Sequence, residues 1–280
     1  MKIPITLLKS MDKNGSYKES DLLFKIALDL SELEPNNASG AGSYGNYYSD
    51  KNKIQQTLQQ MGVKHSNPGV KLIHIPRQRY DNTLEEILGM NIIAPLINQH
   101  TQLVAPIVPQ QSISSILSTG VMATQHFDGI TGKHFRDHFD TSEFGTLFAT
   151  EVITKIATII TKELKKVGIT YMDMHDGNFI IKSRLFTELK TLYYDLINES
   201  KTLSLNVSGL IRLISQALLK IDFNKKICVF DFGMMEISGE SLGGEALMKF
   251  KKTLEKYKNK SHYVSLVSDR IDSIMGRRKY

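Results

Sequence analysis

Before residue 125, the apolar positions mostly follow the two-residue period of β-strands. The segment FKIALDL (24–30) alternates apolar and polar side chains, which is typical of a half-buried strand. VKLIHI (70–75) follows an Asn-Pro-Gly turn and is predicted to be the return strand of a hairpin. Two further strands are predicted from TQLVAPIV, which starts at residue 101, and GVMATQHF, which starts at residue 120.

One helix is predicted in this part of the chain, over residues 81–98. Its leucines and isoleucines share one face, and Asp81 or Asn82 would cap its start. Pro95 would limit its far end, because proline has no N–H to donate and its ring clashes with the preceding turn.

After residue 125 the apolar period becomes helical. A helix is predicted over 144–168, with lysines in its last turn and Gly168 as its stop signal. Its apolar stripe, which we expect to be core, is Phe148, Val152, Ile156, Ile160, Leu164 and Val167. The remaining predicted elements are helices near 183–198 and 206–221, a strand at KKICVF (225–230) and a helix at 242–257. The pattern predicts an α+β fold, with a β-rich part over 1–125 and a mainly α part over 126–280.

The composition is that of a globular protein. The 280 residues suffice for one large domain or two small lobes. The net charge of +6 is concentrated in 249–260 and at the C-terminus. This charge is better explained by a solvated helix face than by nucleic-acid binding, because no zinc-finger or RNA-recognition signature accompanies it.

The sequence suggests a cytoplasmic location. It shows no secretory signal peptide and no apolar run long enough to predict a membrane span. Cys228 is the single cysteine, so an internal disulfide is excluded and a reducing compartment is expected. It lies in the apolar run ICVF, where a core role is expected.

Three motifs carry candidate chemistry. GAGSYGNYY (40–48) is rich in glycine, which lets backbone N–H groups approach phosphate oxygens. It leads into a predicted strand, which disfavours a dinucleotide-binding fingerprint and favours a glycine-rich flap between two strands. VFDFGMM (229–235) ends a strand in Asp-Phe-Gly, and YMDMHDGNFII (171–181) gathers two carboxylates, a histidine and an amide before a strand. GITGK (129–133) lacks the spacing of a phosphate-binding P-loop.

The order of these motifs, with a strand lysine and an acidic helix between them, is that of phosphoryl transfer in protein kinases. Over roughly residues 20–258 the chain resembles the protein-kinase-like superfamily. The resemblance implies a bilobal fold with a small antiparallel β-rich N-lobe (1–125) and a mainly α C-lobe (126–280). It also implies an ATP- and Mg²⁺-dependent kinase, a transferase whose acceptor would be a Ser or Thr hydroxyl of a protein.

The resemblance further assigns residues to roles. Asp173 would be the catalytic base, and Asn178 and Asp231 would be the ligands of magnesium. His175 would contact the transferring phosphate or make a hydrogen bond within its own loop. The nucleotide-binding residues would be Gly40, Gly42, Tyr44, Gly45, Lys71 and Glu85.

Two of these assignments have rivals in the sequence. Lys64, on the other arm of the predicted hairpin, competes with Lys71 for the phosphate-pairing role. Glu86 competes with Glu85 as the partner of that lysine, and an acidic first turn can also serve only the helix dipole.

The departures from the family pattern point to an atypical kinase. Tyr171 and Met172 stand where His-Arg is usual, and His175 stands where protein kinases have lysine. In this the loop is closer to aminoglycoside phosphotransferases and choline kinases. Residues about 183–222 resemble a helical insertion, and no Ala-Pro-Glu follows Asp-Phe-Gly. Such reduced kinases occur among pathogen effectors and large viruses, which would place the protein in a host-cell cytoplasm.

Three alternatives to a protein kinase stay open from the sequence. A small-molecule kinase is favoured by His175 and by the missing Ala-Pro-Glu. A pseudokinase would bind nucleotide or partners without turnover, and Tyr171 in place of histidine leaves room for it. A nucleic-acid-binding protein rests on the positive charge alone.

Overall fold

The computed structural model describes residues 40–42, 45–48, 55–56, 59, 67–74, 88–106, 110–114, 119–232, 235–255, 268–269 and 271–272. The predicted strand at 24–30 lies outside the described residues, as do Tyr44, Lys64, Glu85 and Glu86. Lys71 is described for its backbone only. Within this description the fold is α+β, with antiparallel sheets and several helices, and the chain divides into two compact units.

The first unit contains a five-stranded antiparallel sheet with the strand order β1-β2-β3-β5-β4. In this sheet Gly42 pairs with Gly45, and Tyr47 pairs with Lys71. Gly69 in β3 leaves room for the Tyr47 side chain, because a Cβ there would lie 1.8 Å from the Tyr47 hydroxyl oxygen, which would have to move. The described elements of the unit are β1 (Gly40–Gly42), β2 (Gly45–Tyr48), β3 (Pro68–His74), η2 (Gly89–Ile93), β4 (Gln110–Ser114), β5 (Thr119–Gln125), β10 (Met235–Ile237) and α10 (Leu242–Glu255).

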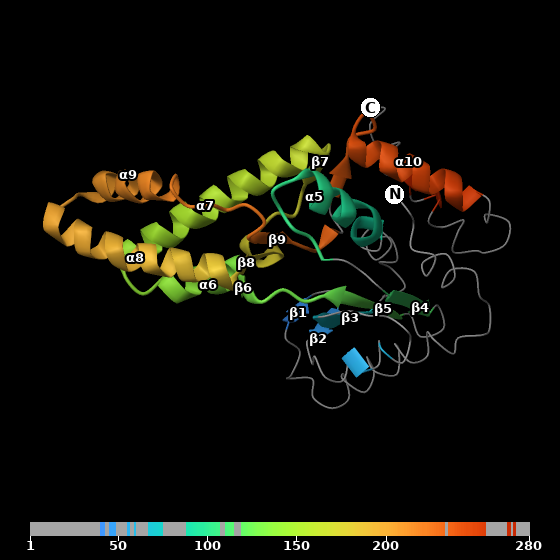
Figure 1. The fold of residues 1–280 in the computed structure, drawn as a ribbon, viewed down its shortest axis with the longest axis horizontal. Helices are drawn as coiled ribbons and strands as arrows, with labels where there is room; N and C mark the ends of the chain where they lie inside the picture. Colours follow the sequence, from blue (N-terminus) through green and yellow to red (C-terminus); the bar gives the residue numbers. More distant parts are fainter. Residues whose placement is uncertain are drawn as a thin grey trace. The chain divides into compact units, whose positions relative to one another are not determined.

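The second unit has a three-stranded antiparallel sheet, β6-β8-β9, and the longest described helices. Figure 1 shows α8 and α9 as a helical hairpin beside α7, within the predicted insertion at 183–222. Most of α5 belongs here. The elements are α5 (Ala94–His100), β6 (Gly129–Thr131), α6 (Gly132–Phe139), α7 (Glu143–Lys166), β7 (Ile169–Tyr171), η3 (Asp176–Asn178), β8 (Phe179–Lys182), α8 (Ser183–Leu203), α9 (Val207–Leu218) and β9 (Ile227–Val229).

The strand predicted from residue 101 is wrong over its described part, 101–106, which makes only an isolated parallel bridge between Val104 and Cys228. Side-chain oxygens, rather than the carbonyls of a neighbouring strand, accept hydrogen bonds from backbone N–H groups of this segment. The Thr101 hydroxyl accepts the N–H of Leu103 at 3.0 Å, and the Asn98 side chain accepts the N–H of Ala105 at 2.9 Å. Such local bonds compete with strand pairing, so the segment turns.

Pro95 lies inside its helix, which ends two residues beyond the predicted boundary at Asn98. The helix continues to His100 because a wider π turn, η2, precedes the proline. In that turn the Ala94 N–H bonds to Gly89 O, five residues back. This local widening relieves the clash that a proline ring makes with the preceding turn of a regular α-helix.

Helix α7 is the central helix of the second unit. Ser142 caps its start by accepting the Gly145 N–H, and Gly168, with φ of 75°, follows its end as the sequence predicted. Its apolar stripe from Phe148 to Leu164 is buried. Among the described residues, α7 is the one helix whose length and apolar composition would allow it to cross a membrane. Core helices of globular proteins share those properties, and the buried stripe identifies α7 as such a helix.

An aromatic cluster joins α6, α7 and α8. The Phe139 ring lies 4.8 Å from that of Phe135, 5.2 Å from that of Phe148 and 4.7 Å from that of Tyr193. These tilted and edge-on arrangements are the favoured geometries of aromatic pairs. The cluster therefore packs α6 against both long helices, α7 and α8.

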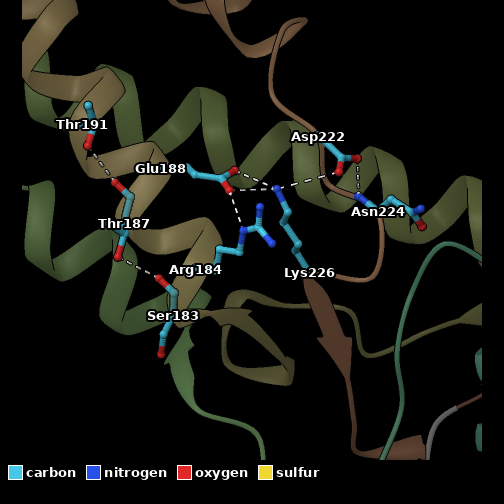
Figure 2. A network of polar contacts seen from close by, with 8 residues as sticks. All are labelled: Ser183, Arg184, Thr187, Glu188, Thr191, Asp222, Asn224 and Lys226. Carbon is cyan, nitrogen blue, oxygen red and sulfur yellow. Dashed lines mark hydrogen bonds and ion pairs between the residues drawn. The ribbon is translucent and has the colours of Figure 1, made fainter.

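Two consecutive lysines before β9 make different attachments. The Lys225 ammonium donates to three backbone carbonyls, those of Asn98, Thr101 and Leu103, at 2.7–3.0 Å. Burial lowers the pKa of Lys225, although nearby Glu163 raises it in part. Lys226 bonds to both carboxylate oxygens of Glu188 on α8, at 3.0 and 2.8 Å. Figure 2 shows Glu188 between Lys226 and Arg184, so the start of β9 is fixed to the insertion.

Candidate active site

The loop from Tyr171 to Asn178 joins β7 to β8 and is ordered by its own hydrogen bonds. The His175 ring accepts the N–H of Gly177 through Nδ1 at 3.0 Å. The N–H of Asn178 donates to His175 O at 3.0 Å. An Nδ1 that accepts a backbone N–H carries no proton, so the structure gives His175 the hydrogen bond within its loop.

Asn178 and Asp173 are joined within this loop. The Asn178 side chain is buried, and its Nδ2 donates to Asp173 O at 2.9 Å. The bond fixes the amide so that its oxygen points to the opposite side. The Asp173 carboxylate is 56% exposed, so its charge is hydrated and a reacting group could reach it. The His175 Nε2 lies 3.9 Å from Asp173 Oδ2, too far for a hydrogen bond.

Asp231 follows β9 and is held next to the same loop. The Phe230 N–H donates to Asn178 O at 3.3 Å. Asp231 has a φ of 62°, the left-handed conformation that residues with a Cβ seldom adopt. The Tyr171 hydroxyl donates to Phe230 O at 2.7 Å and to Asp231 O at 2.8 Å. Tyr171 therefore holds the carbonyls on both sides of the Asp231 N–Cα bond.

Asp176 makes an ion pair with helix α6. Its Oδ2 lies 2.5 Å from Nη1 of Arg136 on α6.

The structure brings only some of the predicted residues together. Asp173, His175, Asn178 and Asp231 lie in the second unit, linked as described above. Lys71 lies in β3 of the first unit, between Tyr47 of β2 and Met122 of β5. The glycines of the predicted nucleotide-covering loop are in the paired strands of that unit: Gly40 and Gly42 in β1, and Gly45 in β2. Tyr44 and Glu85 are not described.

The donors of the second unit fit a magnesium ion. Asp231 offers a carboxylate and Asn178 an amide oxygen, the hard ligands that Mg²⁺ prefers. No group of three or more His, Cys, Asp or Glu side chains suited to a metal exists among the described residues. Mg²⁺ in phosphoryl-transfer sites is commonly held by one or two protein groups with waters and phosphate oxygens, so such a group is not required.

Sequence reasoning missed two contributors to this geometry. Tyr171 was noted only as a departure from the family pattern, and its bonds to residues 230 and 231 were not expected. Arg136 gave no signal at all, because nothing in the pattern of α6 indicates a contact with a loop some forty positions later. Cys228 is buried as expected, and burial raises the pKa of its thiol, so it is an unreactive packing residue.

Comparisons with known proteins give a distant similarity in fold. No family model matches the chain, and no curated protein matches it. Among solved structures, the chain is similar to a mutant of the kinase domain of PknI from Mycobacterium tuberculosis, with 14% identity and a TM-score of 0.37. The match covers 71% of this chain and 58% of that kinase domain. At this level of similarity it identifies no residue of the site.

Proposed function

We propose that the protein is an ATP- and Mg²⁺-dependent phosphotransferase of the protein-kinase-like type. The observation that carries the proposal is that Asn178 bonds to Asp173 O and accepts the N–H of Phe230, the residue before Asp231, within one unit. A base, an amide oxygen and a second carboxylate are what phosphoryl transfer needs from the protein next to the reacting phosphate. An ordinary solvated turn would not need to bury its asparagine, as this loop buries Asn178.

In this proposal Asp173 positions the acceptor and takes its proton. As the acceptor oxygen bonds to the γ-phosphorus, its O–H bond breaks and the proton moves to the Asp173 carboxylate. The bond between the γ-phosphorus and the bridging oxygen breaks, and ADP keeps that oxygen and its electron pair. Asn178 and Asp231 would hold magnesium. The bound ion would neutralise charge on the phosphate oxygens.

The first unit would hold the nucleotide. Lys71 would pair with the α- and β-phosphates as a point charge, with Glu85 or Glu86 as its partner. The N–H groups of the glycine-rich segment at 40–45 would approach the phosphates. His175, through its bond to Gly177, would keep the loop in shape rather than touch the phosphate.

The acceptor we propose is a Ser or Thr hydroxyl of a protein, and we propose a cytoplasmic location, in a host cell if the protein is an effector or viral. A small-molecule kinase is the second candidate, because the Asp-x-His-x-x-Asn spacing of Asp173, His175 and Asn178 is the aminoglycoside and choline kinase pattern. A pseudokinase would require that the same site bind nucleotide without transfer.

The test is incubation of the purified protein with labelled ATP and Mg²⁺, with a generic protein acceptor present. Asp173→Ala and Asp231→Ala are the test variants. Asp195→Ala, which removes an exposed carboxylate from α8, is the matched control. We expect label on Ser or Thr in the wild type and in the control, and none in the test variants.

A nucleotide-induced thermal shift separates the other outcomes. A shift without transfer to protein, followed by transfer to aminoglycoside or choline acceptors, would favour the small-molecule kinase. A shift with no transfer to either class would favour a pseudokinase. No shift with ATP and Mg²⁺ would refute the proposed function.

A further inference from the structure

Helix α6 packs tightly on the loop that carries Asp173. Its first residue, Gly132, leaves no room for a side chain: a Cβ there would lie 2.3 Å from the Phe179 ring and 2.7 Å from Asp176 O. Thr131 caps the helix by accepting the His134 N–H, which fixes the direction in which α6 leaves β6. The start of α6 therefore lies against η3, the turn that ends the loop.

One ion pair joins the two elements. The Asp176 side chain is 16% exposed, and its Oδ2 is fully buried. Arg136, one helical turn after Gly132, is 48% exposed and places Nη1 2.5 Å from that oxygen. This oxygen has no hydrogen bond, and a buried carboxylate oxygen without a nearby cation would be costly, so the charge of Arg136 compensates its burial.

The position of Asp176 is transmitted through the loop. Its neighbours His175 and Gly177 are joined by the bond between Nδ1 and N–H, and His175 O accepts the N–H of Asn178. Asn178 in turn bonds to Asp173 O. These bonds connect Asp176 to Asp173 through consecutive residues of the loop.

We propose that Arg136 is a positioning residue that acts through Asp176 to set the Asp173 and Asn178 side chains. The inference rests on the proposed function for its effect on catalysis, but its effect on the loop does not depend on that function. Arg136 touches neither substrate nor reacting atoms in this scheme. Its role is to hold the loop in one conformation through its ion pair with Asp176.

The decisive variant is Arg136→Gln, which removes the charge and keeps much of the side chain. Lys133→Gln is the matched control, because Lys133 is an exposed cation on the same helix. We expect kcat to fall by roughly 10- to 100-fold in Arg136→Gln, since misplacing reacting groups by about 1 Å costs on the order of 100-fold. The KM for ATP should change less than kcat, because Asn178 is the only proposed nucleotide-holding residue in the loop and the others lie outside it.

Two further variants test the route through Asp176. Asp176→Asn should reproduce the fall in kcat, and the double variant Arg136→Gln/Asp176→Asn should be no worse than the poorer single one, because both changes break the same pair. Arg136→Lys keeps the charge but offers a point donor on a shorter side chain, so it should restore part of kcat. Additive losses in the double variant would overturn the proposed route.

Amide hydrogen exchange supplies a measurement that needs no activity. The Gly177 and Asn178 amides are hydrogen-bonded within the loop and should exchange faster, by about tenfold or more, in Arg136→Gln but not in Lys133→Gln. Unchanged exchange together with unchanged kcat would overturn the proposal. If the wild type transfers no phosphate, the proposed function fails, and exchange alone decides whether Arg136 orders the loop.

Discussion

Replacing Tyr171 by phenylalanine tests how Asp231 is held. The change deletes one oxygen atom and leaves the ring in place. That oxygen is the donor to two successive carbonyls, Phe230 O at 2.7 Å and Asp231 O at 2.8 Å. These carbonyls lie on either side of the backbone bond whose φ is 62°. We expect the variant to be less stable and its Asp231 backbone to leave the left-handed region.

The magnitude follows from the burial of the partners. A shared hydrogen bond contributes a net ~1 kcal/mol, and carbonyls left without a donor cost more only if water cannot reach them. Both Phe230 and Asp231 are partly exposed, so water can replace the hydroxyl in part. We therefore expect a loss of about 1–2 kcal/mol in the free energy of unfolding, a factor of roughly 5–30 in the folded-to-unfolded ratio.

Urea unfolding of the variant beside Tyr194→Phe measures this loss. Tyr194 is 53% exposed on α8, so its hydroxyl is a matched deletion with little expected effect. A second step tests the backbone directly: adding Asp231→Gly to Tyr171→Phe should recover part of the loss, because glycine adopts positive φ without strain. Equal urea midpoints for Tyr171→Phe and Tyr194→Phe would refute the reasoning.

Three further substitutions test the packing around the site. Lys225→Met should lower the free energy of unfolding by about 2–3 kcal/mol, because it removes a charged donor from three carbonyls. Lys220→Met, at an exposed position, should change it little. Urea unfolding midpoints of the two variants measure the difference. Burial raises the pKa of Glu163, but hydrogen bonds from Lys166 and from a backbone N–H lower it, on balance below 4.5. The stabilisation from the ionised Glu163 is therefore present above pH 4.5 and is lost as the pH falls through the folded-state pKa. Glu163→Gln should lose less stability on acidification than the wild type or Glu199→Gln. Gly132→Ala should cost about 1–3 kcal/mol by overpacking against the start of η3, and an unchanged midpoint would contradict the packing described.

The sequence predicted the elements that depend on local pattern. The stripe of α7 and the stop at Gly168 were both found, because helical spacing and a left-handed glycine are visible in the sequence itself. The strands β3 and β5 were found for the same reason, but the predicted hairpin was wrong, because β3 pairs with β2 on one side and with β5 on the other. Elements that depend on a neighbour were missed. The turn after α5 forms because Asn98 and Thr101 satisfy backbone groups, and the sequence read there as a strand.

In the candidate site, too, features encoded locally were predicted and contacts between distant residues were not. Its reacting groups could be named from motif order, because their types and spacing carry the chemistry. The residues that position these groups could not be predicted, because the contacts of Arg136 with Asp176 and of Tyr171 with Asp231 join residues distant in sequence. Whether Asp173, Asn178 and Asp231 act in phosphoryl transfer stays a prediction.

The way Asp231 is fixed argues against its being an ordinary turn residue. The strand before it, β9, is fully buried and lies between two left-handed residues, Lys225 at φ 55° and Asp231 at φ 62°. Its start is fixed by the bonds of Lys225 and Lys226, and its end by the Tyr171 hydroxyl. A solvated turn needs none of these attachments, whereas its positive φ alone is common for an aspartate in a turn. Restraints at both ends of the strand are understandable if the Asp231 carboxylate must stay in one place, as a ligand beside a reacting phosphate must.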